Sequence, residues 1–162
     1  MRFWRCARYL TLASVVSFFV GRLLPRQWPD PYCGLWRSFS FEQEGRIYEK
    51  LGIRRWQKKV PDMSRILPRM IPPKRLEGRD LRHLPEMIRE TCVAELIHLL
   101  LCLSGLYCLH IWPGVGGAFV AALFALGNLP FILVQRYNRP RLKRLLRRRA
   151  QAQYGKELLC AH

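Results

Sequence analysis

Carboxylates are scarce in this sequence of 162 residues. Asp and Glu number 11 against 28 Lys and Arg, so the formal net charge is +17, although 50% of the residues are hydrophobic. The two classes are segregated: Glu95 is the only formal charge between Thr91 and Gln135, and a dense run of Lys and Arg follows from Arg136 to Arg149. An uncharged apolar block with a basic flank is typical of a membrane protein with a cytoplasmic basic face.

Several familiar signatures are also missing from the sequence. It contains no GxSxG elbow, no Walker glycine loop, no GxGxxG and no CxxC pair. We expect the six cysteines to be free thiols, and we expect no bound cofactor. No metal site is expected either, because one E-x-x-H pair lacks the further Glu and His ligands of a di-iron bundle. We expect membrane lipids to balance the basic charge and no nucleic acid to bind.

Two apolar stretches, residues 94–112 and 116–135, each have about the 20 residues that a membrane-spanning helix needs. The uncharged connector PGVG predicts a tight hairpin between them. The apolar stretch near the N-terminus lacks the small-residue cleavage pattern of a signal peptide, so we predict a third, shorter span over residues 9–24.

The predicted fold class is an all-α integral membrane protein that forms a single domain over residues 1–162. The transmembrane hairpin and the short N-terminal helix are joined by a basic loop of short helices over residues 25–90, and residues 136–162 form a basic tail. Prolines break up the loop, but residues 41–52 and the segment LPEMIRETC have helical spacing. The excess of Lys and Arg places the loop and the tail in the cytoplasm and the N-terminus outside.

The stretch ETCVAELIH places Glu90, Glu95 and His98 where lipid is expected to begin. Glu95 and His98 are three residues apart and share a helix face. Glu95 can therefore orient His98 by accepting a hydrogen bond from one imidazole nitrogen, which leaves the other nitrogen as a general base. In the alternative interpretation, Glu95 pairs with an Arg of the loop at headgroup level and His98 only hydrogen-bonds another helix.

Polar side chains gather in NLPFILVQRYNRPRL, where the second span ends. The candidate substrate-binding residues are Asn128, Gln135, Arg136, Asn138 and Arg139. Donors massed at this depth suit a phosphate, a carboxylate or a sugar, and the arginines are also suited to stabilise an oxyanion. A positive-inside stop signal would explain the arginines but not the amide side chains.

The stretch GIRRWQKKVPD combines Arg54, Arg55 and Lys58 with Trp56. These cations can bind lipid phosphates or an anionic substrate, with the indole in the membrane interface. They serve equally well as an interfacial anchor without a ligand.

In their order and spacing, these three motifs resemble the glycosyl-4,4'-diaponeurosporenoate acyltransferases, with the likeness running from about Ser38 to Arg144. The resemblance implies transfer of a fatty acyl group, from an acyl-CoA or acyl carrier protein, to a sugar hydroxyl of a glycosylated C30 carotenoid at the cell membrane. Members commonly have Trp after the motif histidine, where this chain has Leu99. The alternative function is a non-catalytic membrane protein that binds anionic lipids or scaffolds a partner enzyme.

Overall fold

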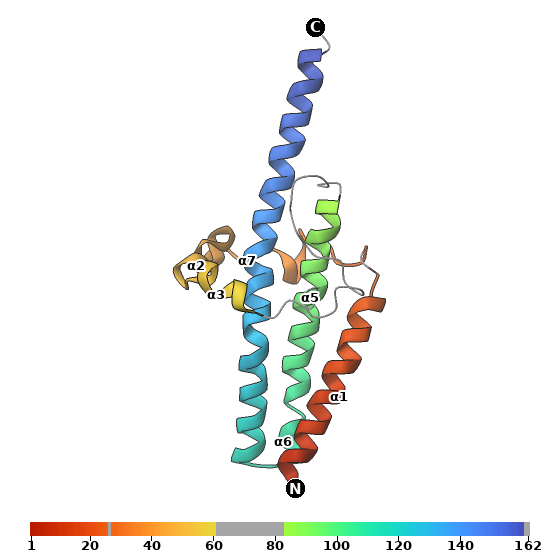
Figure 1. Cartoon of the computed structure of the whole chain (residues 1–162), viewed down its shortest axis with the longest axis vertical. Helices are drawn as coiled ribbons and strands as arrows, with labels where there is room; N and C mark the ends of the chain where they lie inside the picture. The colour runs from red at the N-terminus through yellow and green to blue at the C-terminus, as the bar shows by residue number, and fades with distance from the viewer. Residues whose placement is uncertain (26, 61–82, 161–162) are drawn as a thin grey trace.

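The chain folds into three long helices that run along one another (Figure 1). The computed structural model describes residues 1–25, 27–60 and 83–160, with side chains as far as residue 154. The long helices are α1 (Arg2–Leu23), α5 (Leu84–Gly105) and α7 (Val115–Cys160). Each is long and apolar enough to cross a membrane, and no strand occurs within the described ranges. The predicted all-α class is therefore confirmed.

The helices extend beyond the predicted spans. α1 begins at Arg2 instead of residue 9, and α5 begins at Leu84 instead of residue 94. Hydropathy marks only the part of a helix that suits lipid, whereas the start of α5 follows a backbone signal, Pro85 in its first turn. α7 continues past residue 135 through Pro140, so the basic tail is helical as far as Cys160.

A compact turn joins α5 to α7. The short helix α6 (Cys108–Ile111) follows α5, and Gly114 then adopts a left-handed backbone with φ of 92° before α7 begins. A Cβ atom on Gly117 would lie 2.1 Å from the carbonyl oxygen of Trp112, so only glycine fits this close approach. The turn and the N-terminus lie at one end of the molecule, opposite the C-terminus (Figure 1).

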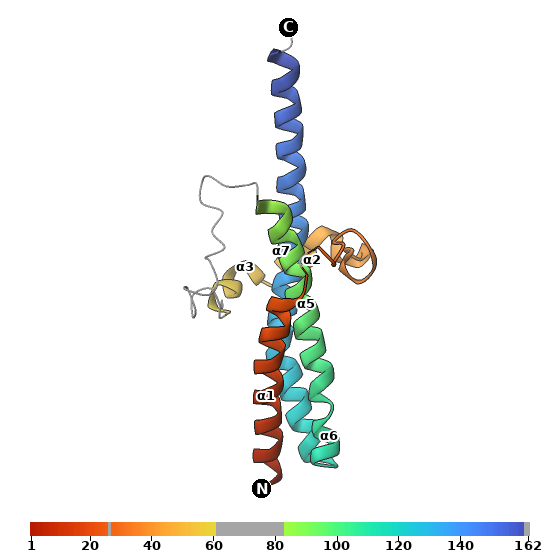
Figure 2. The same cartoon turned by 90° about the vertical axis from the view of Figure 1, so that its right-hand side faces the viewer.

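α5 and α7 lie side by side in both views, and α1 packs against them (Figures 1 and 2). Near the turn, Cys6 and Leu10 of α1 form a buried cluster with Cys108, Val120 and Ala121. The outer face of α1 remains apolar and exposed: Leu12 is 63% exposed and Phe19 is 54% exposed. Such a surface suits contact with lipid chains.

Five short helical segments occupy the described part of the loop. They are η1 (Gly34–Trp36), η2 (Ser40–Gly45), α2 (Arg46–Lys50), α3 (Ile53–Trp56) and η3 (Gln57–Lys59). The single helix predicted over 41–52 is wrong, because Gln43 and Glu44 have left-handed φ angles of 48° and 55°. Gly45 follows with φ of 95°, and a Cβ there would lie 3.3 Å from the Pro140 ring of α7. This reversal lays the loop against α7.

The loop is fixed to α7 by a buried apolar cluster of Tyr48, Ile53 and Tyr137. Ile53 is completely buried and Tyr137 is 1% exposed. The helices α2 and α3, which carry Tyr48 and Ile53, lie at mid-height of the molecule (Figure 2).

Candidate functional site

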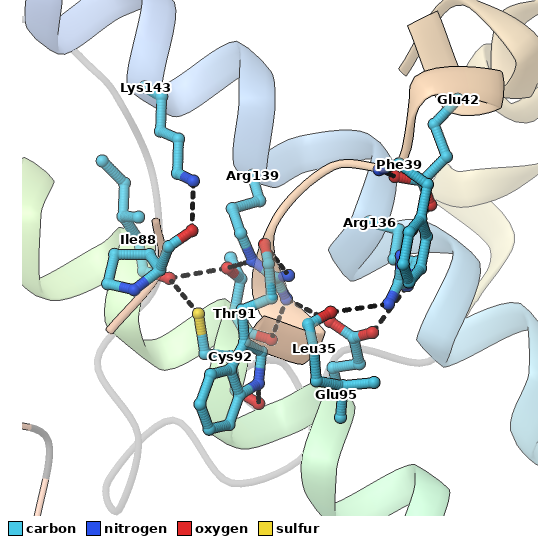
Figure 3. A network of polar contacts seen from close by, with 12 residues as sticks. Leu35, Phe39, Glu42, Ile88, Thr91, Cys92, Glu95, Arg136, Arg139 and Lys143 are labelled. Atoms are coloured by element: carbon cyan, nitrogen blue, oxygen red, sulfur yellow. Dashed lines mark hydrogen bonds and ion pairs between the residues drawn. The ribbon is translucent and has the colours of Figure 1, made fainter. Parts of the chain in front are cut away.

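Glu95 is the centre of a buried polar network between α5, α7 and the loop (Figure 3). Its side chain has no exposed surface. Arg136 Nε donates to Glu95 Oε1 at 2.6 Å, and Arg139 Nη2 donates to Glu95 Oε2. One carboxylate therefore binds two guanidinium groups that lie about one turn apart on α7.

Arg139 is buried by contacts that use most of its donors. Its Nε donates to Thr91 Oγ1 at 2.9 Å, and its Nη1 donates to the carbonyl oxygen of Trp36 at 3.1 Å. Its Nη2 also donates to the carbonyl oxygen of Thr91 at 3.1 Å. Only 2% of Arg139 is exposed, so this guanidinium joins α7 to α5 and to the loop.

Arg136 links the network to a second carboxylate, Glu42 of the loop. Arg136 Nη1 donates to Glu42 Oε1 at 2.7 Å, and its guanidinium carbon lies 4.7 Å from the centre of the Phe39 ring. Glu42 also accepts from the Tyr48 hydroxyl at 2.5 Å and from the Phe39 amide at 2.8 Å. With Glu42 only 3% exposed, the loop is tied to the helices by charge as well as by apolar packing.

We call Glu42, Glu95, Arg136 and Arg139 the inner network. It contains two carboxylates and two guanidinium groups, so its formal charges cancel. Every buried side-chain nitrogen and oxygen atom in the described residues has a hydrogen-bond partner. A buried ion pair with its hydrogen bonds satisfied persists because removing one partner strands a charge, which costs about 3–5 kcal/mol.

The expectation that Glu95 orients His98 is wrong. Both oxygens of Glu95 accept from arginines, and His98 Nδ1 lies 2.9 Å from Oδ1 of Asn128. The alternative interpretation is right that His98 hydrogen-bonds another helix, α7, but it placed the Arg partner of Glu95 in the loop, whereas both arginines come from α7. The carboxylate has these partners because two cations bind it more strongly than a neutral imidazole can.

Asn128 sets the orientation and the tautomer of His98. Asn128 Nδ2 donates to the carbonyl oxygen of Phe124 at 2.9 Å, so its Oδ1 is the atom that accepts from His98 Nδ1. In this arrangement Nδ1 carries the proton and Nε2 keeps its lone pair. Phe131 stacks on the imidazole with ring centroids 4.6 Å apart and 12° between the planes. In its neutral form, His98 therefore has Nε2 as its basic nitrogen.

Gln135 and Asn138 differ from the arginines beside them. Both side chains are half-buried, and in the part of the chain that the structure describes neither makes a hydrogen bond. Gln135 is seven residues from Asn128, so it shares the helix face that carries Asn128 and Phe131. Asn138 lies about 15 Å further along α7 than Asn128. Of the two amides, Gln135 is therefore the nearer to His98 in depth.

Comparison with known proteins identifies the family. The family described as glycosyl-4,4'-diaponeurosporenoate acyltransferase matches this chain over residues 32–148. The chain belongs to this family. Relatives of that name from Staphylococcus aureus strains MRSA252 and USA300 are each 29% identical over 143 residues, covering 88% of this chain and 86% of theirs. No solved structure matches the chain.

The family and the names of the relatives identify the chain as an acyltransferase, in agreement with the resemblance of its motifs. The matched residues include the loop, the inner network and His98, whereas α1 lies before them. This acyltransferase family is therefore recognised by the part of the chain that builds the site.

The described part of the GIRRWQKKVPD segment of this acyltransferase makes contacts with the loop and with α7. Arg54 donates to Glu49 at 2.7 Å and to the hydroxyl of Tyr137 at 3.3 Å, and these bonds raise the pKa of its guanidinium. Trp56 donates to the carbonyl oxygen of Leu51, whereas Arg55 and Lys58 are exposed. Arg54 thus ties this segment to α7, and the last two motif residues, Pro61 and Asp62, lie outside the described residues.

Sequence reasoning overestimated the role of Glu90 and missed Glu42. Glu90 lies eight residues before His98, about 12 Å along α5, and so it does not reach the imidazole. Glu42 was absent from the predicted site, although it is one of only 11 acidic residues in the chain. The scarcity of carboxylates could have indicated Glu42, because in so basic a chain each carboxylate is a candidate ion-pair partner for a buried arginine.

Proposed function

We propose that this acyltransferase moves a fatty acyl group from a thioester donor to a sugar hydroxyl of a glycosylated lipid. The names of its relatives suggest a C30 carotenoid glycoside as the acceptor. The observation that carries the proposal is His98, whose Nδ1 is bound to Asn128 and whose Nε2 is left as a base. An acyl transfer to a hydroxyl needs such a base.

In the proposed reaction, His98 Nε2 takes the proton of the sugar hydroxyl as its oxygen attacks the thioester carbonyl carbon. The carbonyl oxygen becomes an oxyanion, and the carbon–sulfur bond then breaks. The proton on Nε2 passes to the leaving thiolate, so the products are the ester and a free thiol. Asn128 acts as a positioning residue, because the imidazole must present Nε2 and not Nδ1 to the hydroxyl.

Gln135 is the group best placed to bind the developing oxyanion or a sugar hydroxyl. Its half-buried amide makes no hydrogen bond within the described residues, and it lies on the His98 side of α7. Arg136 and Arg139, which were expected to do this, are already engaged by Glu42 and Glu95. We assign these arginines the indirect role of holding α5, α7 and the loop together around the reacting groups.

The charge distribution supports a cell-membrane location with the reacting groups near the cytoplasmic face. The basic half of α7 runs from the inner network toward the C-terminus, whereas the N-terminus lies beside the turn at the other end of the molecule (Figure 1). Lys and Arg accumulate on the cytoplasmic side of membrane proteins. Both ligands would then reach the site from the inner leaflet, with their apolar chains along the helices.

Lipid mass spectrometry tests the proposal in cells that express the chain and are supplied with a glycosylated carotenoid. Wild type should produce a lipid heavier by one fatty acyl group. His98→Ala should lower the rate about 10²–10⁴-fold, which is the usual contribution of a general base. His98→Gln, which can still donate to Asn128, should be equally impaired at matched membrane levels.

The matched control is His110→Ala, because His110 is exposed on α6 at the far end of the molecule. It should keep the wild-type rate. If His98→Ala and His110→Ala give equal product, His98 has no role in the chemistry. Asn128→Ala should lower kcat and leave the donor KM unchanged, which separates positioning of the base from binding of substrate.

A further inference from the structure

A second polar feature lies beyond the inner network, where the loop crosses the basic half of α7. A cavity of about 420 Å³ opens there, which is within the range of roughly 300–1,000 Å³ that small-molecule sites occupy. We call it the outer pocket. Its cationic lining residues are Arg37 of the loop and Lys143, Arg144 and Arg147 of α7.

The positive charges of the outer pocket are poorly matched. Among the residues that the structure describes, four cations line it together with one carboxylate, Glu44, whose oxygen lies 3.7 Å from Arg144 Nη1. Glu44 is 61% exposed, so this pair is weak. Lys143 donates to the carbonyl oxygen of Pro31 and lies 4.3 Å from the centre of the Tyr32 ring, but neither group carries a negative charge.

The rest of the lining adds neutral polar groups to these cations. Ser38, Ser40 and Gln43 come from the loop, and Phe39 and Pro140 supply apolar surface. Hydroxyl and amide donors beside arginines are the usual surroundings of a bound phosphate. Gln43 and Glu44 adopt their left-handed backbone at this rim, and non-glycine residues in that conformation are held there by the surrounding structure.

We propose that the outer pocket binds a phosphate ester. Two sources have this chemistry: the coenzyme part of an acyl thioester donor, and the headgroup of an anionic phospholipid. The assignment to the donor rests on the proposed acyl transfer, whereas the phosphate site itself does not.

The position of the pocket favours the donor as the source. Lys143 lies twelve residues after Phe131, which stacks on His98, so the two levels are about 18 Å apart along α7. In coenzyme A an extended pantetheine arm separates the phosphates from the sulfur. A phosphate held in the outer pocket therefore lets the thioester extend toward His98.

Binding to the full chain in nanodiscs of phosphatidylcholine tests the proposal. Coenzyme A is titrated calorimetrically into wild type, Arg37→Gln, Arg147→Gln and Arg148→Gln. Arg147 lines the pocket and Arg148 does not, although both are exposed and adjacent on α7. Each pocket variant should bind about tenfold more weakly, as expected for one lost charge-assisted hydrogen bond. Arg148→Gln should match wild type.

A second arm uses nanodiscs that also contain phosphatidylglycerol, with the lipid retained by each variant counted by native mass spectrometry. Coenzyme A binding that depends on Arg37 and Arg147 assigns the site to the donor. Retention of phosphatidylglycerol with the same dependence, in the absence of coenzyme A binding, assigns it to the lipid headgroup. If neither probe binds, or if Arg147→Gln and Arg148→Gln lose binding equally, the outer pocket is not a phosphate site.

Acyl transfer measured on the same preparations keeps the two proposals separate. If wild type binds coenzyme A through the pocket but transfers no acyl group, the phosphate site stands and the proposed function fails. If wild type transfers the acyl group and the donor KM is the same for Arg147→Gln and Arg148→Gln, the function stands and the assignment of the pocket to the donor fails.

Discussion

The inner network and the outer pocket use the same residue types on neighbouring turns of α7, yet their electrostatics differ. Arg136 and Arg139 are matched by Glu95 and Glu42, whose side chains are 0% and 4% exposed. Within the described part of the chain, the cations that line the outer pocket have one carboxylate among them, the exposed Glu44. A basic helix can thus hold a fold together where carboxylates reach it, and is available to an anionic ligand where they do not.

Replacing Glu95 should affect stability most. Glu95→Gln leaves two buried guanidinium groups without their shared charge, so we expect a loss of about 3–5 kcal/mol in unfolding free energy. Thermal unfolding in detergent measures this. The control is Glu49→Gln, which removes the carboxylate of an exposed pair with Arg54 and should change stability little. Equal losses in the two variants would contradict the special role of the inner network.

Alkaline pH should weaken the inner network through Tyr48. Burial raises the pKa of the Tyr48 phenol, and the hydrogen bond to Glu42 raises it further. Because the folded state prefers the protonated phenol, this contribution is complete below the ordinary pKa of about 10 and is lost as pH rises above it.

Tyr48→Phe should therefore lower the free energy of unfolding by about 1 kcal/mol at neutral pH. As the pH rises above about 10, the variant should lose less stability than wild type does. Thermal unfolding followed between neutral and strongly alkaline pH gives both quantities. Tyr154→Phe, at a side chain that is 66% exposed, provides the control. If Tyr48→Phe loses as much stability at alkaline pH as wild type does, the Tyr48 phenol is not the cause of the alkaline loss.

Neutralising the outer pocket should have the smallest effect on stability. Arg147→Gln removes one exposed cation from a group of neighbouring cations, so the unfolding free energy should change by less than about 0.5 kcal/mol. At low salt the change should be toward greater stability, since like charges repel, and added salt should remove it. A marked destabilisation would mean that Arg147 belongs to the fold and not to a ligand site.

The sequence predicted the elements better than the contacts between them. The local sequence is enough to predict the spans over residues 94–112 and 116–135, because a membrane span is identified by its apolar length and composition. Arg136 and Arg139 were predicted as site residues from their position at the end of a span, and Glu95 from its position at the start of one. Their pairing joins residues 41 and 44 positions apart in the sequence, and no local pattern reports such a contact.

Two parts of the structure were beyond local rules. Helical spacing predicted one helix over residues 41–52, but Gln43 and Glu44 adopt left-handed backbone because the following loop packs on α7. His98 was predicted as a base, yet its partner Asn128 lies thirty positions away and had been assigned to substrate. Both outcomes depend on tertiary packing, which overrides local spacing.

α7 is one continuous helix of 46 residues, about 70 Å long, whereas the hydrocarbon layer of a membrane is about 30 Å thick. Its apolar half can match a thinner layer by tilting, because a helix cannot shorten. The basic half has no loop or linker to absorb the tilt, so it moves with the apolar half. The depth of the outer pocket relative to the lipid headgroups is therefore set by the thickness of the bilayer.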